Sequence, residues 1–294
     1  MKSGFVCIVG RPNTGKSTLL NTVLDNKVAI VSNVAGTTRN TIQGVYNDEE
    51  AQIVFIDTPG IHKPKDKLGK YLNRQSYNAI KDIDVILFVI DAASGIGKGD
   101  KFIIDTFKNT DIPVVLVLNK IDKLNDEQII KAISESKDLY EFAEIVPISA
   151  MKNDNIKRLI KVIKEYLTDD IIYYDDGTVT NTSIHFMVAE LVREKILNLT
   201  NEEVPHSITC ATTHYQDNGH IVDIYVDIII DRDSLKKIII GKQGLMLKNI
   251  GSLARRDIEN LIGKQVYLEL FVKTIKSWRD KERYLQELGF KEHM

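Results

Sequence analysis

Residues 10–17 read Gly-Arg-Pro-Asn-Thr-Gly-Lys-Ser, which fits the pattern GxxxxGK[ST] of a phosphate-binding loop. An apolar, strand-like run at 5–9 precedes this loop, and a helical pattern at 16–24 follows it. The backbone N–H groups of such a loop point toward phosphate oxygens, and the helix adds the positive end of its dipole. We therefore predict a nucleotide site here, in which Lys16 reaches the β and γ phosphates and Ser17 gives its hydroxyl to Mg²⁺.

A second motif, Asp57-Thr-Pro-Gly60, follows the apolar run at 53–56. We expect Asp57 to hold Mg²⁺ through water and the Gly60 N–H to meet the γ-phosphate. Alone, this stretch is also compatible with an ordinary turn, but its place after the phosphate loop favours a nucleotide role. The expected phosphate contacts are Gly10, Arg11, Pro12, Asn13, Thr14, Gly15, Lys16, Ser17, Thr18, Asp57, Thr58, Pro59 and Gly60.

Two further motifs end the apolar runs at 114–118 and 145–148. Asp122, in Asn119-Lys120-Ile121-Asp122, is placed to accept hydrogen bonds from the guanine N1–H and exocyclic amine, a pair of donors that adenine lacks. Asn119 and Lys120 would support the base, and the backbone of Ser149-Ala150 would meet guanine O6. We therefore expect GTP and GDP as ligands. The order of these motifs over about residues 4–168 resembles the translation-factor-like class of small GTPase domains.

Gly36-Thr37-Thr38-Arg39 occupies the place of the first switch in that class. We expect Thr38 to be the second Mg²⁺ hydroxyl, with Thr37 as the alternative. Many GTPases place a water-orienting Gln directly after the second motif, but Ile61 stands there. In similar GTPases with a hydrophobic residue at that position, K⁺ is often held near a phosphate-loop Asn, which here is Asn13.

No catalytic residue is certain from this pattern. The candidates are Asn13, Thr38 and Gly60, and slow intrinsic hydrolysis is expected. Asn13 alternatively only braces the loop. His62 is a weak candidate for a general base, because loop histidines are more often solvated or structural.

Strand-like and helical runs alternate through the first half of the chain, which predicts an α/β P-loop domain at 1–168 with a mainly parallel sheet and helices on both faces. Ligands in such sheets bind at the carboxyl ends of the strands. The polar stretch at 169–185, which contains Gly177, is predicted to be a linker. An α+β domain is expected over 186–294, ending in a helix at 277–288.

Gly241-Lys242-Gln243-Gly244 lies between two predicted helices, with a strand pair before them and a strand after them. This order is typical of a type II KH domain, whose GXXG loop approaches a nucleic-acid backbone. A chance turn is the alternative for so short a motif. However, 232–283 carries 13 Lys and Arg residues against 6 Asp and Glu, in a chain of net charge −2. A solvated helical surface would also explain the charge, but a phosphate-rich partner is favoured. The expected RNA contacts are Gly241, Lys242, Gln243, Gly244, Lys248, Arg255 and Arg256.

Two cysteines, Cys7 and Cys210, lie in apolar runs and are expected to be buried thiols in a reducing cytosol.

A zinc site at His206, Cys210 and His214 is disfavoured, because strand positions four apart are separated by about 13 Å. No run of about 18 apolar residues predicts a transmembrane helix.

These motifs together resemble the Era family of bacterial GTPases along nearly the full chain. The matching stretches are GRPNTGKSTLLN at 10–21, FIDTPGIHKPK at 55–65, LVLNKID at 116–122, VPISA at 146–150, LVREKILNLTNEEVPHS at 191–207, IIIGKQG at 238–244 and VYLELFVK at 266–273. The resemblance implies binding of the 3′ end of 16S rRNA, a role in 30S subunit assembly, and a cytoplasmic protein that also associates peripherally with the cell membrane. A monomer with no DNA partner is expected. One departure is Gly36, where the family usually has Gln.

Two rival functions remain at this point. One is a non-enzymatic nucleotide sensor at the membrane, in which GXXG is only a turn. The other is a tRNA-modification GTPase, for which the sequence shows no partner-modification domain. Salt-dependent RNA affinity that depends on Lys242 would separate the RNA-binding hypothesis from the membrane sensor, which a lipid-flotation assay tests from the other side.

Overall fold

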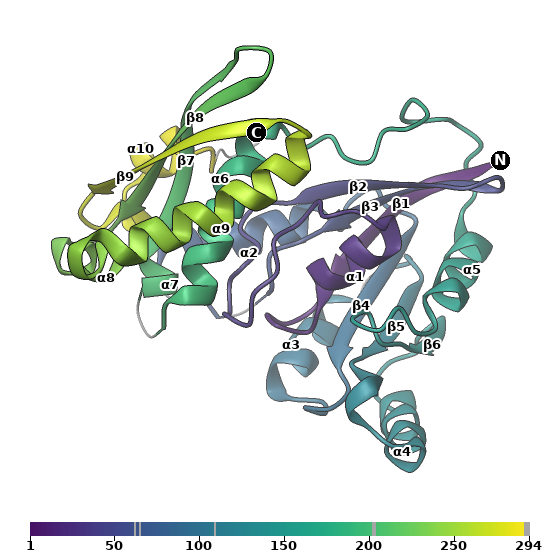
Figure 1. Ribbon diagram of the computed structural model, residues 1–294. Coiled ribbons are helices and arrows are strands. Elements are labelled where there is room, and N and C mark those ends of the chain that lie inside the picture. The colour runs from purple at the N-terminus through teal and green to yellow at the C-terminus, as the bar shows by residue number, and fades with distance from the viewer. Residues whose placement is uncertain (62, 65, 109, 202–203, 291–294) are drawn as a thin grey trace. The chain divides into compact units, whose positions relative to one another are not determined.

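The computed structural model describes residues 1–61, 63–64, 66–108, 110–201 and 204–290 (Figure 1). It divides into two compact units. Unit 1 comprises Met1–Ala29, Thr38–Lys63 and Leu72–Asn181. Unit 2 comprises Ile30–Thr37, Pro64–Tyr71 and the chain from Thr182 onward, so two short segments from the first half of the sequence belong to the second unit.

Unit 1 is built on a six-stranded sheet in the order β2-β3-β1-β4-β5-β6 (Figure 1). All neighbouring strands are parallel except β2 and β3, which form an antiparallel pair. The strands are β1 (Lys2–Val9), β2 (Ile42–Asn47), β3 (Ala51–Asp57), β4 (Val85–Asp91), β5 (Val114–Asn119) and β6 (Glu144–Pro147). The predicted α/β class with a mainly parallel sheet is confirmed, although the edge strand β2 was not predicted.

Helices cover both faces of this sheet, because alternate side chains of the strands point to opposite sides. Val6 and Ile8 lie in one core with side chains of α1 and α5, whereas Cys7 and Val9 lie in the other with side chains of α2, α3 and α4. The helices are α1 (Lys16–Leu24), α2 (Lys67–Asn78), α3 (Lys98–Thr106), α4 (Asp126–Lys137) and α5 (Ile156–Tyr166), with the short turn η1 (Ile121–Lys123) after β5. The nucleotide motifs accordingly follow the carboxyl ends of β1, β3, β5 and β6.

Most of the stretch expected as a linker at 169–185 is bound along unit 1. The Ser3 N–H donates to the Asp169 carbonyl (2.8 Å), and the Val45 N–H donates to the Val179 carbonyl (2.8 Å). The side chain of Gln52 donates to the Tyr174 carbonyl (2.9 Å). Backbone groups that leave water need such partners, and residues of β1, β2 and β3 supply them.

Unit 2 holds a mixed three-stranded sheet in the order β7-β8-β9, in which β8 is antiparallel to β7 and parallel to β9. Apolar side chains of α6, α8 and α9 pack on one face of this sheet in a single core. The elements are α6 (Ile184–Leu199), α7 (Val204–Ser207), β7 (Ile208–Asp217), β8 (Ile221–Ile230), η2 (Asp233–Leu235), α8 (Lys236–Ile240), η3 (Lys242–Gly244), α9 (Leu245–Ile262), β9 (Gln265–Thr274), η4 (Trp278–Asp280) and α10 (Glu282–Glu287).

Two expectations for this unit need correction. The helix expected over 277–288 is split into η4 and α10, because Ser277 has a left-handed backbone (φ 55°) and Lys281 is extended. Trp278 is fully buried instead, and its indole N–H donates to the Ser207 carbonyl (3.2 Å). Cys210 is only partly buried, whereas Cys7 is fully buried, and burial raises the pKa of the Cys7 thiol.

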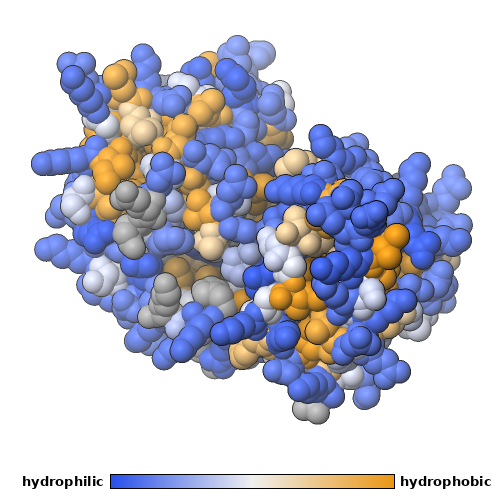
Figure 2. All heavy atoms as spheres, turned by 90° about the horizontal axis from the view of Figure 1, so that it is seen from below, coloured by the Kyte–Doolittle hydropathy of each residue, from blue (hydrophilic) through white to orange (hydrophobic). Residues whose placement is uncertain are grey.

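Hydrophobic residues form scattered patches among hydrophilic ones on the face shown in Figure 2. Over the residues that the structure describes, no helix combines the length and the apolar character needed to cross a bilayer. Isolated apolar side chains on the surface are ordinary for a folded protein.

Candidate nucleotide and RNA sites

The phosphate loop is held in shape by contact with the strand that carries the guanine motif. Gly15 has a left-handed backbone (φ 95°), and a Cβ built there would lie 2.3 Å from Asn119 Nδ2. Asn119 Nδ2 in turn donates to the Thr14 carbonyl (2.9 Å). Only glycine satisfies both the conformation and the close approach, so Gly15 fixes the entry of the loop into α1.

Lys16 is 5% exposed and lies inside the loop. Its ammonium group donates to the carbonyls of Gly10 (3.1 Å) and Arg11 (2.9 Å). Burial lowers the pKa of Lys16 to about 8, although the nearby Asp57 carboxylate opposes that shift. A buried ammonium group within a phosphate loop is well placed to neutralise a phosphate.

Three oxygen-bearing side chains meet beside the loop. Ser17 Oγ lies 2.8 Å from Thr38 Oγ1 and donates to Asp57 Oδ2 (2.6 Å). Asp57 Oδ1 is buried and has no hydrogen-bond partner among the described residues. Burial raises the pKa of Asp57 to about 6, against the opposing effects of Lys16 and Ser17. The cluster thus offers two hydroxyl oxygens and a carboxylate, one oxygen of which, Asp57 Oδ1, has no hydrogen-bond partner among the described residues. Such a set fits the preference of Mg²⁺ for oxygen ligands.

The structure brings Thr38, and not Thr37, to this cluster. The Thr37 hydroxyl donates to the Val34 carbonyl within its own segment (2.7 Å). The two threonines also fall in different units, with Thr38 in unit 1.

The guanine motif is braced from both sides. Ser149 Oγ donates to Asp122 Oδ1 (2.6 Å), and the Ala150 N–H donates to Asn119 Oδ1 (3.0 Å). Lys120 Nζ donates to the Asn13 carbonyl (2.6 Å), which joins this motif to the phosphate loop. The residues expected to contact guanine therefore come together at one end of β5 and β6.

Two carboxylates that support the site were not predicted. Asp91 lies 2.7 Å from Lys120 Nζ, and although burial alone would raise the pKa of Asp91, Lys120 lowers it overall. Asp100 is fully buried and accepts from Arg11 Nε (2.7 Å). The position of Asp91 at the end of an apolar strand was a usable signal, whereas nothing near Asp100 in the sequence pointed to Arg11. The Arg11 side chain therefore contacts α3, while the Arg11 carbonyl accepts from Lys16 within the phosphate loop.

The side chains of two predicted phosphate-site residues have partners within the protein, and a third residue allows two loops to approach closely. Thr58 Oγ1 donates to the Ile8 carbonyl (2.8 Å), and Thr14 Oγ1 donates to the Arg11 carbonyl (3.1 Å). A Cβ on Gly60 would lie 2.7 Å from Pro12 N, so Gly60 permits the close approach of these two loops.

The side chain of Ile61 is buried in the core of unit 1 and carries no polar atom, although the Ile61 N–H donates to the Gly10 carbonyl (3.3 Å). His62 lies outside the described residues. The described part of the second motif therefore provides no side chain that would orient an attacking water molecule.

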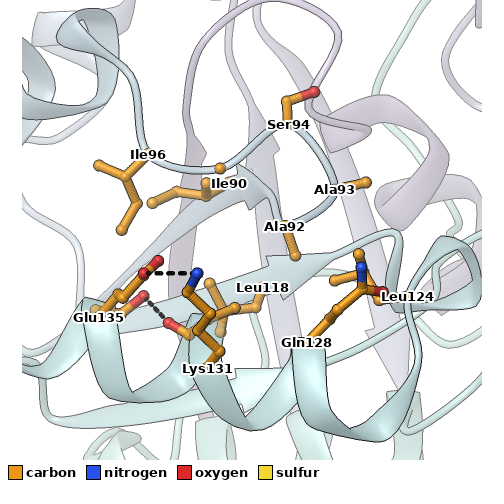
Figure 3. Close-up of a pocket in the computed structure, with 13 residues that line it drawn as sticks. Ile90, Ala92, Ala93, Ser94, Ile96, Leu118, Leu124, Gln128, Lys131 and Glu135 are labelled. Carbon is orange, nitrogen blue, oxygen red and sulfur yellow. Dashed lines mark hydrogen bonds and ion pairs between the residues drawn. The ribbon is translucent and has the colours of Figure 1, made fainter.

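A separate pocket of about 300 Å³ lies between α4 and the loop that follows β4 (Figure 3). Ile90 and Leu118 contribute to its lining, and Lys131 and Glu135 of α4 form an ion pair there (3.7 Å). None of its lining residues belongs to the expected contact sets for phosphate or guanine.

In unit 2 the GXXG turn separates α8 from α9. Gly241 (φ 72°) could not carry a Cβ, which would lie 2.9 Å from the Met246 backbone N. Gly244 (φ 78°) caps the N-terminus of α9 in a left-handed conformation. Gln243 also has a positive φ of 53°. The turn is therefore tight and exposes its polar side chains.

A groove of about 390 Å³ runs along α9 beside β9. Its lining residues are Gly244, Leu247, Lys248, Gly251, Ser252, Arg255, Leu268, Glu269 and Leu270. Lys242, Lys248 and Arg255 are exposed, so the turn and the groove together present cations to solvent. Arg256 is exposed on α9 but does not line the groove. An open groove with a positive rim and an apolar floor suits stacked bases and a phosphate backbone.

The fold and the two sites define a GTPase with an appended KH domain, and comparison with known proteins agrees. A family model described as a 50S ribosome-binding GTPase matches residues 5–120, and a KH domain model matches residues 203–279. Two solved Era structures are each 43% identical to the chain, cover 99% of both chains and superimpose with a TM-score of 0.96. One is a variant of Aquifex aeolicus Era bound to GDP·AlF4⁻, and the other is Era in complex with MgGDPNP and nucleotides 1506–1542 of 16S ribosomal RNA. The chain belongs to the Era family.

Proposed function

We propose that this chain is a GTP-dependent switch that binds the 3′ end of 16S rRNA through its KH domain and assists maturation of the 30S ribosomal subunit in the cytoplasm. The observation that carries the proposal is the GXXG turn and basic groove on α9, in a chain similar over 99% of its length to Era in complex with that RNA. GTP hydrolysis would end the RNA-binding state.

In the nucleotide site, Lys16 would neutralise the β and γ phosphates, and Asp122 would select guanine. Ser17, Thr38 and Asp57 would hold Mg²⁺, which supplies positive charge to the transferring phosphoryl group. Their clustering within hydrogen-bonding distance supports these roles.

K⁺ is proposed as an additional source of positive charge at Asn13, which adopts a left-handed backbone (φ 65°) in the phosphate loop. Hydrolysis should then be faster in K⁺ than in Na⁺ at equal ionic strength, and Asn13→Ala should remove the difference. Equal rates in the two salts would refute the role of K⁺ and leave the GTPase assignment intact.

RNA binding can be tested by fluorescence anisotropy with a labelled single strand copying the 16S rRNA 3′ end, at two salt concentrations. Lys242→Asp should weaken binding about tenfold or more, because it reverses a charge beside a phosphate. Arg283→Asp is the matched control, since Arg283 is also exposed but lies on α10.

Equal losses in the two variants would mean that the effect comes from net charge and not from the GXXG turn. If the wild-type chain shows no salt-dependent RNA affinity, the KH proposal fails, and flotation with anionic vesicles becomes the next test.

A further inference from the structure

The sheet of unit 2 has a second face, which points away from the helices of that unit. Val222, Ile224 and Val226 of β8 are fully buried in the core that contains side chains of α6, α8 and α9. Successive side chains of a strand point to opposite faces, so Asp223 and Tyr225 point to the second face. Figure 1 shows α9 running beside β9, while the loop end of the hairpin of β7 and β8 extends past the helices.

The strand β9 repeats this alternation. Leu268 and Leu270 pack against the core, so Tyr267, Glu269 and Phe271 lie on the second face. Tyr267 is 54% exposed and Phe271 is 39% exposed. Because β9 is an edge strand, Glu269 also borders the groove along α9.

Aromatic rings from all three strands meet on this second face. His214 of β7 is paired in register with Tyr225, and their rings stack with centroids 4.7 Å apart and planes at 29°. The ring of Phe271 meets Tyr225 edge-on, with centroids 6.0 Å apart and planes at 78°. Rings that pack on one another are held in fixed orientations, which lowers the entropy lost when a ligand binds to them. We call this surface the aromatic face, and it consists of His214, Asp223, Tyr225, Tyr267, Glu269 and Phe271.

Two carboxylates lie between these rings. The parallel register of β8 and β9 pairs Asp223 with Tyr267 and Tyr225 with Glu269, so each pair combines one ring with one carboxylate on strands about 4.8 Å apart. Asp223 accepts a hydrogen bond from the neutral Asn218 side chain (2.8 Å). In the described part of the chain neither Asp223 nor Glu269 has a cation as an ion-pair partner.

The charge of the aromatic face determines which ligands suit it. Carboxylates repel phosphate groups, so RNA and anionic lipid are disfavoured. A guanidinium group suits it well, because its plane can stack on a tyrosine or phenylalanine ring while its N–H groups donate to a neighbouring carboxylate. A lysine ammonium group can form the ion pair but has no plane to stack.

We propose that the aromatic face is a docking surface for a basic, arginine-containing segment of a partner protein. Guanidinium groups of that segment stack on the exposed rings of β8 and β9 and pair with Asp223 and Glu269. Proteins bound to RNA carry such segments, because Lys and Arg neutralise phosphates. The inference goes beyond the proposed RNA binding, which uses cations on the other side of β9, and the two surfaces of unit 2 therefore select ligands of opposite charge.

The test is fluorescence anisotropy of the full chain with a fluorescein-labelled peptide of alternating arginine and glycine. A lysine peptide of the same length should bind about threefold to tenfold more weakly, because it keeps the charge but loses the stacking. A citrulline peptide keeps the planar shape without the charge and should bind about tenfold more weakly or less. If the wild-type chain binds the arginine and citrulline peptides equally, the proposal is wrong.

Variants then place the peptide on the molecule. Tyr267→Ser and Phe271→Ser should each weaken binding of the arginine peptide about fivefold, because each removes a stacking partner. Asp223→Asn removes a charge at constant shape and should have an effect of about the same size. Leu261→Ser is the matched control, since Leu261 on α9 is 40% exposed, close to the value for Phe271, and this variant should bind the peptide like the wild type.

Unchanged peptide affinity in both ring variants would refute the docking surface, as would an equal loss in Leu261→Ser. RNA affinity of Tyr267→Ser and Phe271→Ser should remain within about twofold of the wild type, since neither residue lines the groove. If these variants lose RNA binding instead, the face serves RNA. If the chain self-associates in sedimentation and Phe271→Ser abolishes that association, a second copy covers the face, and the proposal is again wrong.

Discussion

The phosphate loop and the GXXG turn both place a helix N-terminus where it can bind phosphate, but they place their cations differently. In each, a glycine with a left-handed backbone directly precedes the helix, Gly15 before α1 and Gly244 before α9, and neither helix has an acidic residue in its first turn. Both helix N-termini therefore favour a phosphate. The difference lies in the cations, since Lys16 is buried in its loop whereas Lys242 is exposed.

This difference predicts two kinds of recognition. A buried ammonium group among preset donors binds a compact ligand strongly, because water does not compete with it. Exposed cations along an open groove each contribute little, act nearly independently and are screened by salt. Substitutions in the nucleotide site should therefore have large effects that depend weakly on salt, and substitutions in the groove should have graded effects that depend strongly on it.

The largest effect is expected from Lys16→Met. It removes the buried cation while keeping an unbranched side chain only one atom shorter, and kcat for GTP hydrolysis should fall about 100-fold or more. Phosphate release measures this directly, and Lys101→Met on the exposed part of α3 is the control. If the hydrolysis rate of Lys16→Met falls less than about tenfold, the buried Lys16 would not differ in effect from the exposed cations of the groove.

Asp122→Asn should change which base is bound. Asparagine presents a donor where the guanine amine also donates, so GTP affinity should fall about 100-fold while affinity for XTP, which has a carbonyl there, should rise. Competition binding with the two nucleotides checks this. A uniform loss for both would mean that Asp122 acts through its hydrogen bond with Ser149 and not through the base.

In the groove, Arg255→Ser should weaken RNA binding only about fivefold to tenfold and should lower the slope of log affinity against log salt by about 0.7 to 1. Arg256→Ser is the matched comparison, because Arg256 is exposed on the same helix but outside the groove lining. An unchanged slope for Arg255→Ser would place the RNA backbone elsewhere.

The smallest effect is expected at an ion pair outside both sites. Burial would raise the pKa of Asp48, but hydrogen bonds from Lys164 and Tyr46 lower it overall, from 3.8 to about 2. The lowered pKa stabilises the fold above about pH 4, and this contribution is lost as the pH falls toward about 2. Asp48→Asn should therefore cost about 1 kcal/mol at neutral pH after allowance for solvent screening.

Denaturant unfolding at several pH values gives this difference. It should shrink below pH 4, and a difference that grows on acidification would contradict the assigned pKa.

Local patterns predicted the nucleotide motifs and most helices because neighbouring residues determine them. The bounds of α1 are those expected from the sequence, since the phosphate loop marks its beginning and a short polar loop follows it. The strand β2 was missed because Gly44 interrupts its apolar pattern. A Cβ at Gly44 would lie 2.4 Å from Leu24 Cδ1. The glycine at this position is therefore required by close packing against α1, which local strand preference does not reveal.

Contacts between distant residues could not be predicted from the sequence. Nothing near Thr37 indicates that Arg193, 156 residues away, binds its carbonyl. Likewise, Arg11 fits the phosphate-loop pattern, but its partner is the buried Asp100. The motif positions thus predict where the ligand binds, whereas the residues that hold those positions are known only from the fold.

The central claim is that one chain couples the two sites, and thermodynamic linkage provides its most direct test. RNA copying the 16S rRNA 3′ end should bind more tightly to the MgGDPNP state than to the GDP state, by some measured factor. The same RNA must then raise the affinity for MgGDPNP relative to GDP by the same factor. If the factor for RNA affinity and the factor for nucleotide affinity are equal and greater than one, the switch is established. If RNA affinity is the same in both nucleotide states, the chain carries two independent binding sites.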